Sequence, residues 1–245
     1  MALSLAPLPG LPEVRPGDDL AALLAAAPID PPLGPGDVLV IAHKVVSKAE
    51  GRVRALAEVE PGDRARALAA EHGKDPRHVQ VVLDDTTELL RADHGRLICR
   101  TRHGFTCANA GVDQSNAGAP ETVVLLPDDP DGSARALRAR LGAGAVVITD
   151  SWGRPWREGQ IEVAIGCAGL PPLIDWRGHV DRDGRAIAAS MTAIADEVAA
   201  AADLVRAKDS GEPAVRVRGL ENYVIEEMGP GAAALVRPPE EDLFR

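Results

Sequence analysis

Short apolar runs separated by glycine- and proline-rich turns are the main pattern along the chain. Runs of four or five mostly apolar residues predict buried strands, and they occur at residues 38–41, 79–83, 97–100, 122–126, 145–148 and 214–217. Helical spacing of apolar residues predicts three helices, at residues 64–72, 133–141 and roughly 186–208. Ser133 is the expected N-cap of the second helix, and Gly73 and Gly142 are expected to end the first two.

These elements do not alternate strictly between strand and helix. That order favours an α+β fold with mixed sheets, or an irregular α/β fold, over a doubly wound sheet or a β/α barrel. The predicted helix at 186–208 has few polar positions between Ile194 and Leu204. A helix this apolar is usually buried on more than one side, in a core or against a second subunit, so we expect a homodimer. The 245 residues suit one domain or two small ones, and no linker or repeat divides them.

Composition narrows the classes of ligand. Hydrophobic residues make up 45% of the chain, which is too many for a disordered protein. Aromatic residues make up only 2%, which argues against a nucleic-acid binder built on stacked aromatic side chains. The formal net charge of −10 argues against non-specific binding to DNA or to an anionic membrane. An anionic ligand must therefore be met by a local cluster of positive groups.

The amino terminus and the cysteines both indicate a cytoplasmic protein. Residues 1–10 have no basic segment, prolines interrupt their apolar run, and no window of the chain reaches the length of a transmembrane helix. The three cysteines, Cys99, Cys107 and Cys167, are isolated and odd in number. A disulfide framework or a structural zinc site is therefore not expected, and small buried thiols are the simpler interpretation.

The common nucleotide and hydrolase signatures are missing, because the chain has no GxxxxGK[ST], no GxGxxG after a strand, no HExxH and no GxSxG. A different arrangement follows the predicted strand at 38–41. Lys44 and Lys48 stand one helical turn apart, and Ser47 lies beside Lys48. Two ammonium groups and a hydroxyl in this spacing suit phosphate oxygens. The alternative is an ordinary solvated first turn of a helix.

Two further segments carry candidate chemistry. Residues 109–116 are dense in Asn, Asp, Ser and Gly, which fits either hard oxygen ligands for Mg²⁺ or Mn²⁺ or a plain polar turn. Residues 149–157 place Asp150 at the expected end of the strand at 145–148, among two arginines and two tryptophans. A carboxylate there is positioned to meet a metal at the rim of the sheet, and a structural Arg–Asp pair is the alternative.

Taken together and in order, the segments resemble the coenzyme F420:L-glutamate ligase family, the γ-glutamyl ligases of deazaflavin cofactor biosynthesis. The matching stretches are residues 10–20, 44–52, 103–104, 108–116, 149–154, 200–205, 217–220 and 235–245. Because they span nearly the whole chain, we treat residues 1–245 as one ligase domain. The tail at 235–245 resembles the actinobacterial form, in which a nitroreductase-like domain often follows. We expect this chain to lack that domain.

The resemblance implies a GTP-dependent ligase that adds L-glutamate to the deazaflavin coenzyme F420 precursor, first through an amide bond and then through γ-glutamyl bonds. It also implies two divalent ions, Mg²⁺ or Mn²⁺, together with K⁺. The implied fold is a two-lobed subunit in an intertwined homodimer.

Individual roles carry over onto matching positions. The resemblance implies that nucleotide contacts come from Leu11, Pro12, Glu13, Val14, His43, Lys48, Asn116 and the loop containing Lys208, Asp209, Ser210 and Gly211. It implies metal ligation by Asp113, Asp150 and Ser151. Two positions depart from the family pattern. His43 stands where relatives often have Ser, and Lys208 stands where they often have Gln or an acidic ligand. An ammonium has no lone pair for a metal, so the second metal is less secure than the first.

The chemistry of the reaction agrees with this interpretation. A carboxylate and an amine do not condense in water without activation, and phosphoryl transfer from GTP would convert the carboxylate into an acyl phosphate. Asp113 and Asp150 with their metals, together with Lys48 and Arg154 as catalytic groups, would stabilise the charge on the phosphate oxygens. Two alternatives stay open. One is a metal-dependent phosphohydrolase that uses Asp113 and Asp150. The other is a non-catalytic nucleotide-binding partner of a reductase domain.

Overall fold

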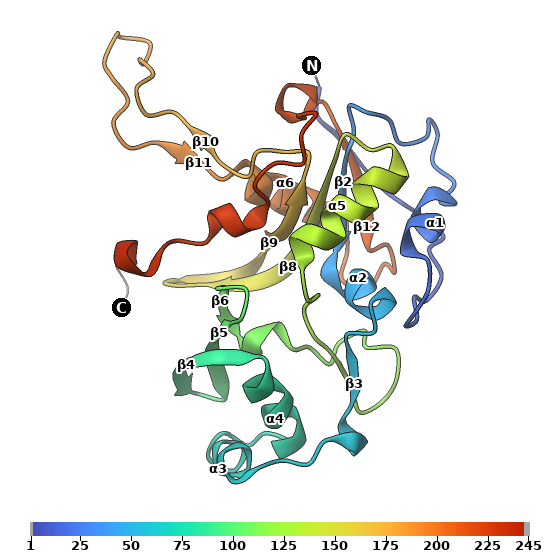
Figure 1. The fold of residues 1–245 in the computed structure, drawn as a ribbon, viewed down its shortest axis with the longest axis vertical. Helices are drawn as coiled ribbons and strands as arrows, with labels where there is room; N and C mark the ends of the chain where they lie inside the picture. Colours follow the sequence, from blue (N-terminus) through green and yellow to red (C-terminus); the bar gives the residue numbers. More distant parts are fainter. Residues whose placement is uncertain (1, 243–245) are drawn as a thin grey trace.

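A computed structural model describes residues 2–242, and its centre is a five-stranded sheet (Figure 1). The strand order is β1-β12-β2-β8-β9, from β1 (Ser4–Pro7), β12 (Ala214–Arg218), β2 (Val38–Ala42), β8 (Ala145–Arg154) and β9 (Arg157–Ala168). Strands β2 and β8 pair in parallel, whereas the other neighbours in this sheet pair antiparallel. The ends of β2 and β8 therefore lie at the same edge of the sheet, with Ala42 opposite Thr149.

Both faces of this sheet are covered, which explains why the run at 38–41 is apolar at every position. Leu39 and Ile41 pack on one face together with helices α1 (Leu20–Ala25), α2 (His43–Ala49) and α5 (Pro130–Leu141). Val38 and Val40 pack on the other face against α6 (Ile194–Asp203). Side chains that alternate between two cores fix the register of β2, because a slip by one residue would exchange the two sets.

A separate core lies beyond the edge where α2 begins (Figure 1). It joins a three-stranded antiparallel sheet to two helices, α3 (Asp63–His72) and α4 (Pro76–Asp84). The strands are β4 (Thr86–Asp93), β5 (Arg96–Thr101) and β6 (Thr106–Ala108). The short pair β3 (Val53–Ala55) and β7 (Thr122–Val124) connects this part of the chain to the main sheet.

The remaining elements are short. Strands β10 (Ile174–Asp175) and β11 (Met191–Thr192) form the base of an arm that extends away from the main sheet in Figure 1. Single 3₁₀ turns occupy Leu56–Glu58, Asn109–Gly111, Glu221–Tyr223, Ala232–Leu235 and Pro239–Glu241. Met1 and residues 243–245, which end the tail motif at 235–245, lie outside the described residues.

The structure confirms the mixed α+β class and the strands predicted at 38–41, 97–100, 145–148 and 214–217. The strand predicted at 79–83 is wrong, because these residues lie in α4. Asp75 caps that helix by accepting a hydrogen bond from the backbone of Arg77, and Pro76 occupies its first turn. An Asp-Pro pair at a helix start is a stronger signal than a short run of β-branched residues.

Two further predictions need correction. The helix predicted at 186–208 is limited to Ile194–Asp203, because Met191 and Thr192 pair with β10 instead. Ser133 does not cap α5. The helix begins one turn earlier, where the side chain of Asp129 accepts from the backbone N–H of Gly132 at 2.9 Å. Gly73 and Gly142 do end α3 and α5, both in the left-handed conformation.

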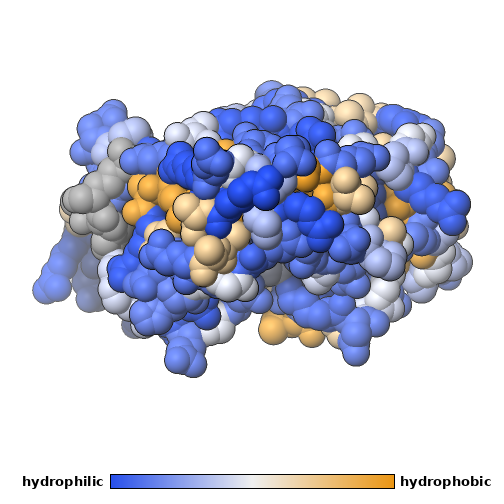
Figure 2. All heavy atoms as spheres, turned by 90° about the horizontal axis from the view of Figure 1, so that it is seen from below, coloured by the Kyte–Doolittle hydropathy of each residue, from blue (hydrophilic) through white to orange (hydrophobic). Residues whose placement is uncertain are grey.

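The surface and the cysteines agree with the composition. Seen from the end that carries α3 and α4, the face in Figure 2 is mostly hydrophilic and has separate smaller hydrophobic patches. Cys99, Cys107 and Cys167 are buried free thiols, as expected. Across residues 2–242, none of the helices combines the length and the apolar character that spanning a bilayer requires.

The cap of α5 can be tested by mutation. Asp129→Ala removes the acceptor for the Gly132 N–H and should lower the free energy of unfolding by about 1 kcal/mol. Ser133→Ala keeps that cap and should lower the free energy of unfolding by less than Asp129→Ala does. Urea unfolding of both variants measures the difference. A larger loss in Ser133→Ala than in Asp129→Ala would contradict this assignment.

Candidate functional site

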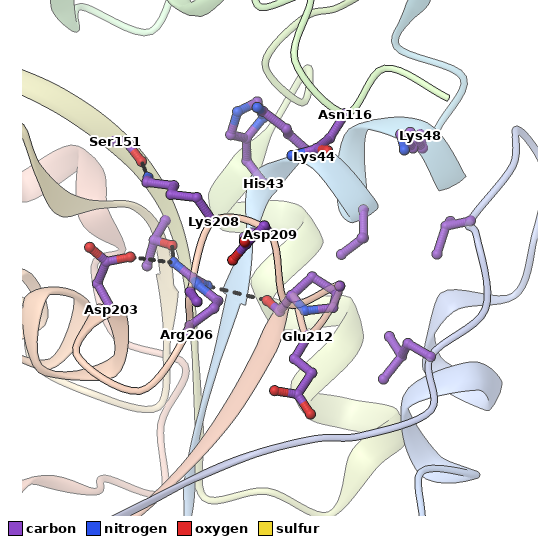
Figure 3. A pocket seen from close by; sticks show the side chains of 18 of the residues that line it. His43, Lys44, Lys48, Asn116, Ser151, Asp203, Arg206, Lys208, Asp209 and Glu212 are labelled. Atoms are coloured by element: carbon purple, nitrogen blue, oxygen red, sulfur yellow. Dashed lines mark hydrogen bonds and ion pairs between the residues drawn. The ribbon is translucent and has the colours of Figure 1, made fainter. Parts of the chain in front are cut away.

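A cavity of about 360 Å³ opens where the parallel pairing of β2 with β8 ends (Figure 3). Segments that are far apart in the sequence meet around it. They are the stretch before α1, the first turns of α2, the loop before β7, the middle of β8 and β9, and the loop between α6 and β12. The edge beyond the carboxyl ends of neighbouring parallel strands is a common place for a ligand site.

Helix α2 brings both of its lysines to the cavity, although the sequence left a solvated turn open as an alternative. Lys48 is 5% exposed, and its Nζ donates to the Oε1 of Glu13. Gly118, which has a left-handed conformation, lies close to this pair, and a Cβ there would lie 3.0 Å from Glu13 Oε1. A buried ammonium with one carboxylate partner is held ready for a second anion.

Lys44, one turn earlier, connects the cavity to the polar loop at 109–116. Its Nζ lies 2.6 Å from Asp113 Oδ2 and 2.6 Å from the Oγ of Ser115. Burial alone would raise the pKa of Asp113, but the hydrogen bonds from Lys44 and Ser115 and the charge of Lys44 together outweigh it, and the pKa lies below its ordinary value. Asp113 is therefore an ionised carboxylate at neutral pH, paired with an ammonium that lines the cavity.

Asp150 lies on β8 just beyond the parallel pairing, where two hydrogen-bond donors and one imidazole contact its carboxylate. His43 Nε2 lies 3.3 Å from its Oδ1, the backbone N–H of Ser151 donates to Oδ1 at 2.8 Å, and the indole N–H of Trp152 donates to Oδ2 at 2.8 Å. Burial would raise the pKa of Asp150, yet His43 and the hydrogen bonds hold it below its ordinary value. Asp113 and Asp150 are thus contacted by consecutive residues of α2.

Trp152 is itself packed edge-on against Phe105, with ring centroids 5.5 Å apart, and Phe105 stacks on His103. Phe105 lies in the turn between β5 and β6. This aromatic chain joins the second sheet to the main sheet and fixes the indole that orients Asp150.

The other face of β8 presents a different cluster, because neighbouring strand residues point to opposite faces. Ser151 pairs across the ladder with Glu162 of β9, and their side chains are hydrogen-bonded. Arg206 donates to Glu162 Oε2 at 2.7 Å, and Lys208 donates to Ser151 Oγ. Burial would raise the pKa of Glu162, but the charge of Arg206 and the hydrogen bonds lower it overall.

Most of the residues implied by the resemblance line this one cavity. They are Leu11, Pro12, Glu13, Val14, His43, Lys48, Asn116, Asp150, Ser151, Lys208, Asp209 and Gly211. Asp113 is not a lining residue, but it is hydrogen-bonded to Lys44, which lines the cavity. Two others are not among the lining residues. Ser210 donates to the carbonyl of Ala207 within its own loop, and Arg154 lies at the β8–β9 hairpin, where it donates to the carbonyl of Glu158.

The structure also corrects the end of β8 and adds residues that the sequence did not single out. The strand predicted at 145–148 continues to Arg154, so Asp150 lies within the strand rather than at its end. Glu162, with 3% exposure, and Asp203 and Glu212 also line the cavity. A single acidic residue in the apolar stretch 161–165 was the available signal for Glu162.

The donor set is suited to a hard divalent ion that is shared with a ligand. Within residues 2–242, no group of three or more His, Cys, Asp or Glu side chains is arranged so that it could hold a metal ion. Mg²⁺ commonly binds through one or two carboxylates while substrate phosphates and water complete its shell. Asp150, with Asp113 behind Lys44, fits that mode rather than a site made by the protein alone.

Comparison with known proteins identifies the family. A family model described as F420-0:Gamma-glutamyl ligase matches residues 10–219. The chain belongs to this family. Among the relatives, the coenzyme F420:L-glutamate ligase of Methanopyrus kandleri is 48% identical over 250 residues, which cover 99% of this chain and 98% of that protein. The protein of the same name from Methanothermobacter thermautotrophicus is 44% identical over the whole of both chains.

A third member of the family, the coenzyme F420:L-glutamate ligase of Halobacterium salinarum, is 48% identical over 220 residues. That match covers 86% of this chain and 85% of the relative. The family match includes the segments that surround the cavity, from the stretch before α1 to the loop before β12.

The orientation of Asp150 gives a prediction about pH. Trp152→Phe removes the indole donor and should raise the pKa of Asp150, since its charged form loses a hydrogen bond. Ionised Asp150 stabilises the fold above the carboxyl's unfolded-state pKa, and this contribution is lost as pH falls through the folded-state pKa. The variant should therefore lose this stabilising contribution at a higher pH than the parent chain does.

Carbon NMR of aspartate-labelled protein measures this titration, with the Asp150 signal assigned by its absence in Asp150→Asn. Trp176→Phe is the matched control, because it removes an indole hydrogen bond to Thr192 in the arm. It should leave the Asp150 midpoint unchanged. An equal midpoint in Trp152→Phe and the parent chain would contradict the assigned role of Trp152.

Proposed function

We propose that this chain is a GTP-dependent ligase that joins L-glutamate to the deazaflavin coenzyme F420 precursor. The first bond is an amide, and later residues are added through γ-glutamyl bonds. The observation that carries the proposal is the gathering of Lys44, Lys48 and Lys208 with Asp150 around one cavity, in a chain that belongs to this family.

The lysines support binding of a triphosphate by a chain of net charge −10. Lys44 and Lys48 extend from one face of α2, and Lys208 reaches in from the loop before β12 (Figure 3). Each ammonium already has an oxygen partner on the protein, which holds it in place before a ligand arrives. Preorganised charge of this kind stabilises phosphate oxygens without reorganisation during the reaction.

Divalent ions belong to the proposal because GTP phosphates and carboxylates are their usual ligands. Asp150 and Asp113 are the side chains that would hold such an ion. Ser151 is the further ligand that the family resemblance implies, but in this chain its Oγ accepts from Lys208. The resemblance also brings K⁺ into the proposal. Mg²⁺ or Mn²⁺, when bound, supplies positive charge to the phosphate oxygens.

The proposed reaction has two displacements. An oxygen of the precursor's carboxylate attacks the γ-phosphorus of GTP, so that GDP leaves and an acyl phosphate forms. The amine of L-glutamate then attacks the acyl carbon, and phosphate leaves with the carboxylate oxygen. Lys44 and Lys48 hold the phosphate chain in line for the first step.

The proposal includes an intertwined homodimer of two-lobed subunits. Several large apolar side chains on and near the arm and the end of α6 support a partner surface. Leu204 is 85% exposed, Val180 is 66% exposed and Met191 is 45% exposed. A partner subunit packed against the arm and the end of α6 would cover these side chains.

Transfer of an oxygen isotope tests the mechanism. The precursor is labelled with ¹⁸O in its carboxylate and incubated with GTP, Mn²⁺ and L-glutamate. We expect phosphate that carries one ¹⁸O, together with a product one glutamyl unit heavier, and mass spectrometry measures both. Asp150→Asn should release essentially no phosphate, since it removes a negative charge from the cavity wall.

Three results would contradict the proposal. Unlabelled phosphate would exclude the acyl phosphate. Phosphate released equally fast without the precursor would indicate a phosphohydrolase. Binding of GTP with no turnover in the complete mixture would indicate a non-catalytic nucleotide-binding protein.

A further inference from the structure

Lys208 makes an unusual set of contacts for an exposed lysine. Its side chain is 66% exposed, yet its Nζ reaches the Oγ of Ser151 and lies 3.3 Å from the Oε1 of Glu162. The carboxylate it contacts is 4% exposed. Figure 3 shows the side chain extended from the loop before β12 toward Ser151. A long exposed side chain loses conformational freedom when it is held in this way, so the contact must be favourable.

Glu162 does not need Lys208 for its charge to be balanced. Arg206 is buried and donates to Glu162 Oε2 at 2.7 Å, and it also donates to Thr149 Oγ1. This pair already places a guanidinium against the carboxylate. With Lys208 added, two cations face Glu162, and a second carboxylate, Asp203, lies 4.0 Å from Arg206.

Arg206 also fixes the loop that carries Lys208. Its Nη1 donates to the carbonyl of Pro213 at 3.2 Å, which joins the two ends of the loop (Figure 3). The loop is therefore anchored to β8 and β9 through one buried guanidinium. Lys208 is positioned over Ser151 by this anchor rather than by its own exposed stem.

Ser151 Oγ and Glu162 Oε1 are hard oxygens of the kind that divalent ions use. Both accept from the Lys208 ammonium in this chain. We propose that the Lys208 ammonium is a tethered cation that occupies the place of a bound metal ion on this face of β8. A metal ion bound to the nucleotide would then lie on the opposite face of β8, beside Asp150.

The proposal follows from charge and geometry. An ammonium and a divalent ion cannot share the same two oxygens, because like charges at contact distance repel strongly. The tethered charge needs no ion from solution, and two of its three N–H groups are used by the protein. The third remains for an anionic oxygen in the cavity, which under the proposed function is a phosphate oxygen of GTP.

Counting bound Mn²⁺ tests the proposal, by measuring free Mn²⁺ with electron paramagnetic resonance in the absence of nucleotide. Lys208→Gln removes the charge and offers a carbonyl oxygen. This variant should bind one Mn²⁺ per chain more than the parent at the same free concentration. Lys208→Arg keeps the charge and should match the parent. Lys74→Gln, which makes the same charge change outside the cavity lining, should also match it.

A double variant locates the added ion. Lys208→Gln with Ser151→Ala should bind the extra Mn²⁺ more weakly than Lys208→Gln alone, and circular dichroism checks that both are folded. An unchanged count in Lys208→Gln would overturn the proposal, and so would an equal gain in Lys74→Gln. An extra ion unaffected by Ser151→Ala would also overturn it. The Mn²⁺ count is made without nucleotide, so it does not depend on GTP turnover. A separate finding that the chain does not turn over GTP would contradict the proposed function but not the proposal about Lys208.

Discussion

The parallel pairing of β2 with β8 is the constraint on which the rest of the site depends. It ends at Ala42 and Thr149, so the first turn of α2 and the carboxylate of Asp150 emerge side by side. The pairing is stable because alternate residues of β2 enter two cores, one under α5 and one under α6. A slip of β2 by one residue would exchange the side chains that enter the two cores and would displace His43 from Asp150.

Charge pairing is the second organising feature. Three carboxylates at or beside the cavity are held by a donor from another segment: Asp113 by Lys44, Glu13 by Lys48, and Glu162 by Arg206. Buried charges are costly unless they are paired. The contacts that fix these side chains therefore also lower the energetic cost of placing charged groups at the site. An incoming triphosphate competes with these carboxylates for the lysines. The site can thus be acidic in composition and still offer ammonium groups to an anion.

Sequence alone predicted several features that depend on neighbouring residues, although the local signals at 79–83 and at Ser133 gave wrong predictions. The strand at 38–41 and the Lys44–Lys48 spacing are local, and both are found in the structure. Glu162 was missed because its partners, Ser151 and Arg206, are set by hairpin register and by a distant loop. Arg154 and Asp150 are in the same segment, yet the continuation of β8 carries Arg154 away from the cavity lining. The family resemblance supplied the roles that no local pattern contains.

The central claim is that the lysines of this cavity bind the phosphates of GTP, and Lys48 is its most direct test. Isothermal titration of GTP into Lys48→Met should show a dissociation constant raised by about tenfold or more, the loss expected for one charge-assisted hydrogen bond. Lys74→Met, outside the cavity lining, should bind GTP as the parent does. Equal affinity in the parent and a folded Lys48→Met would contradict the account.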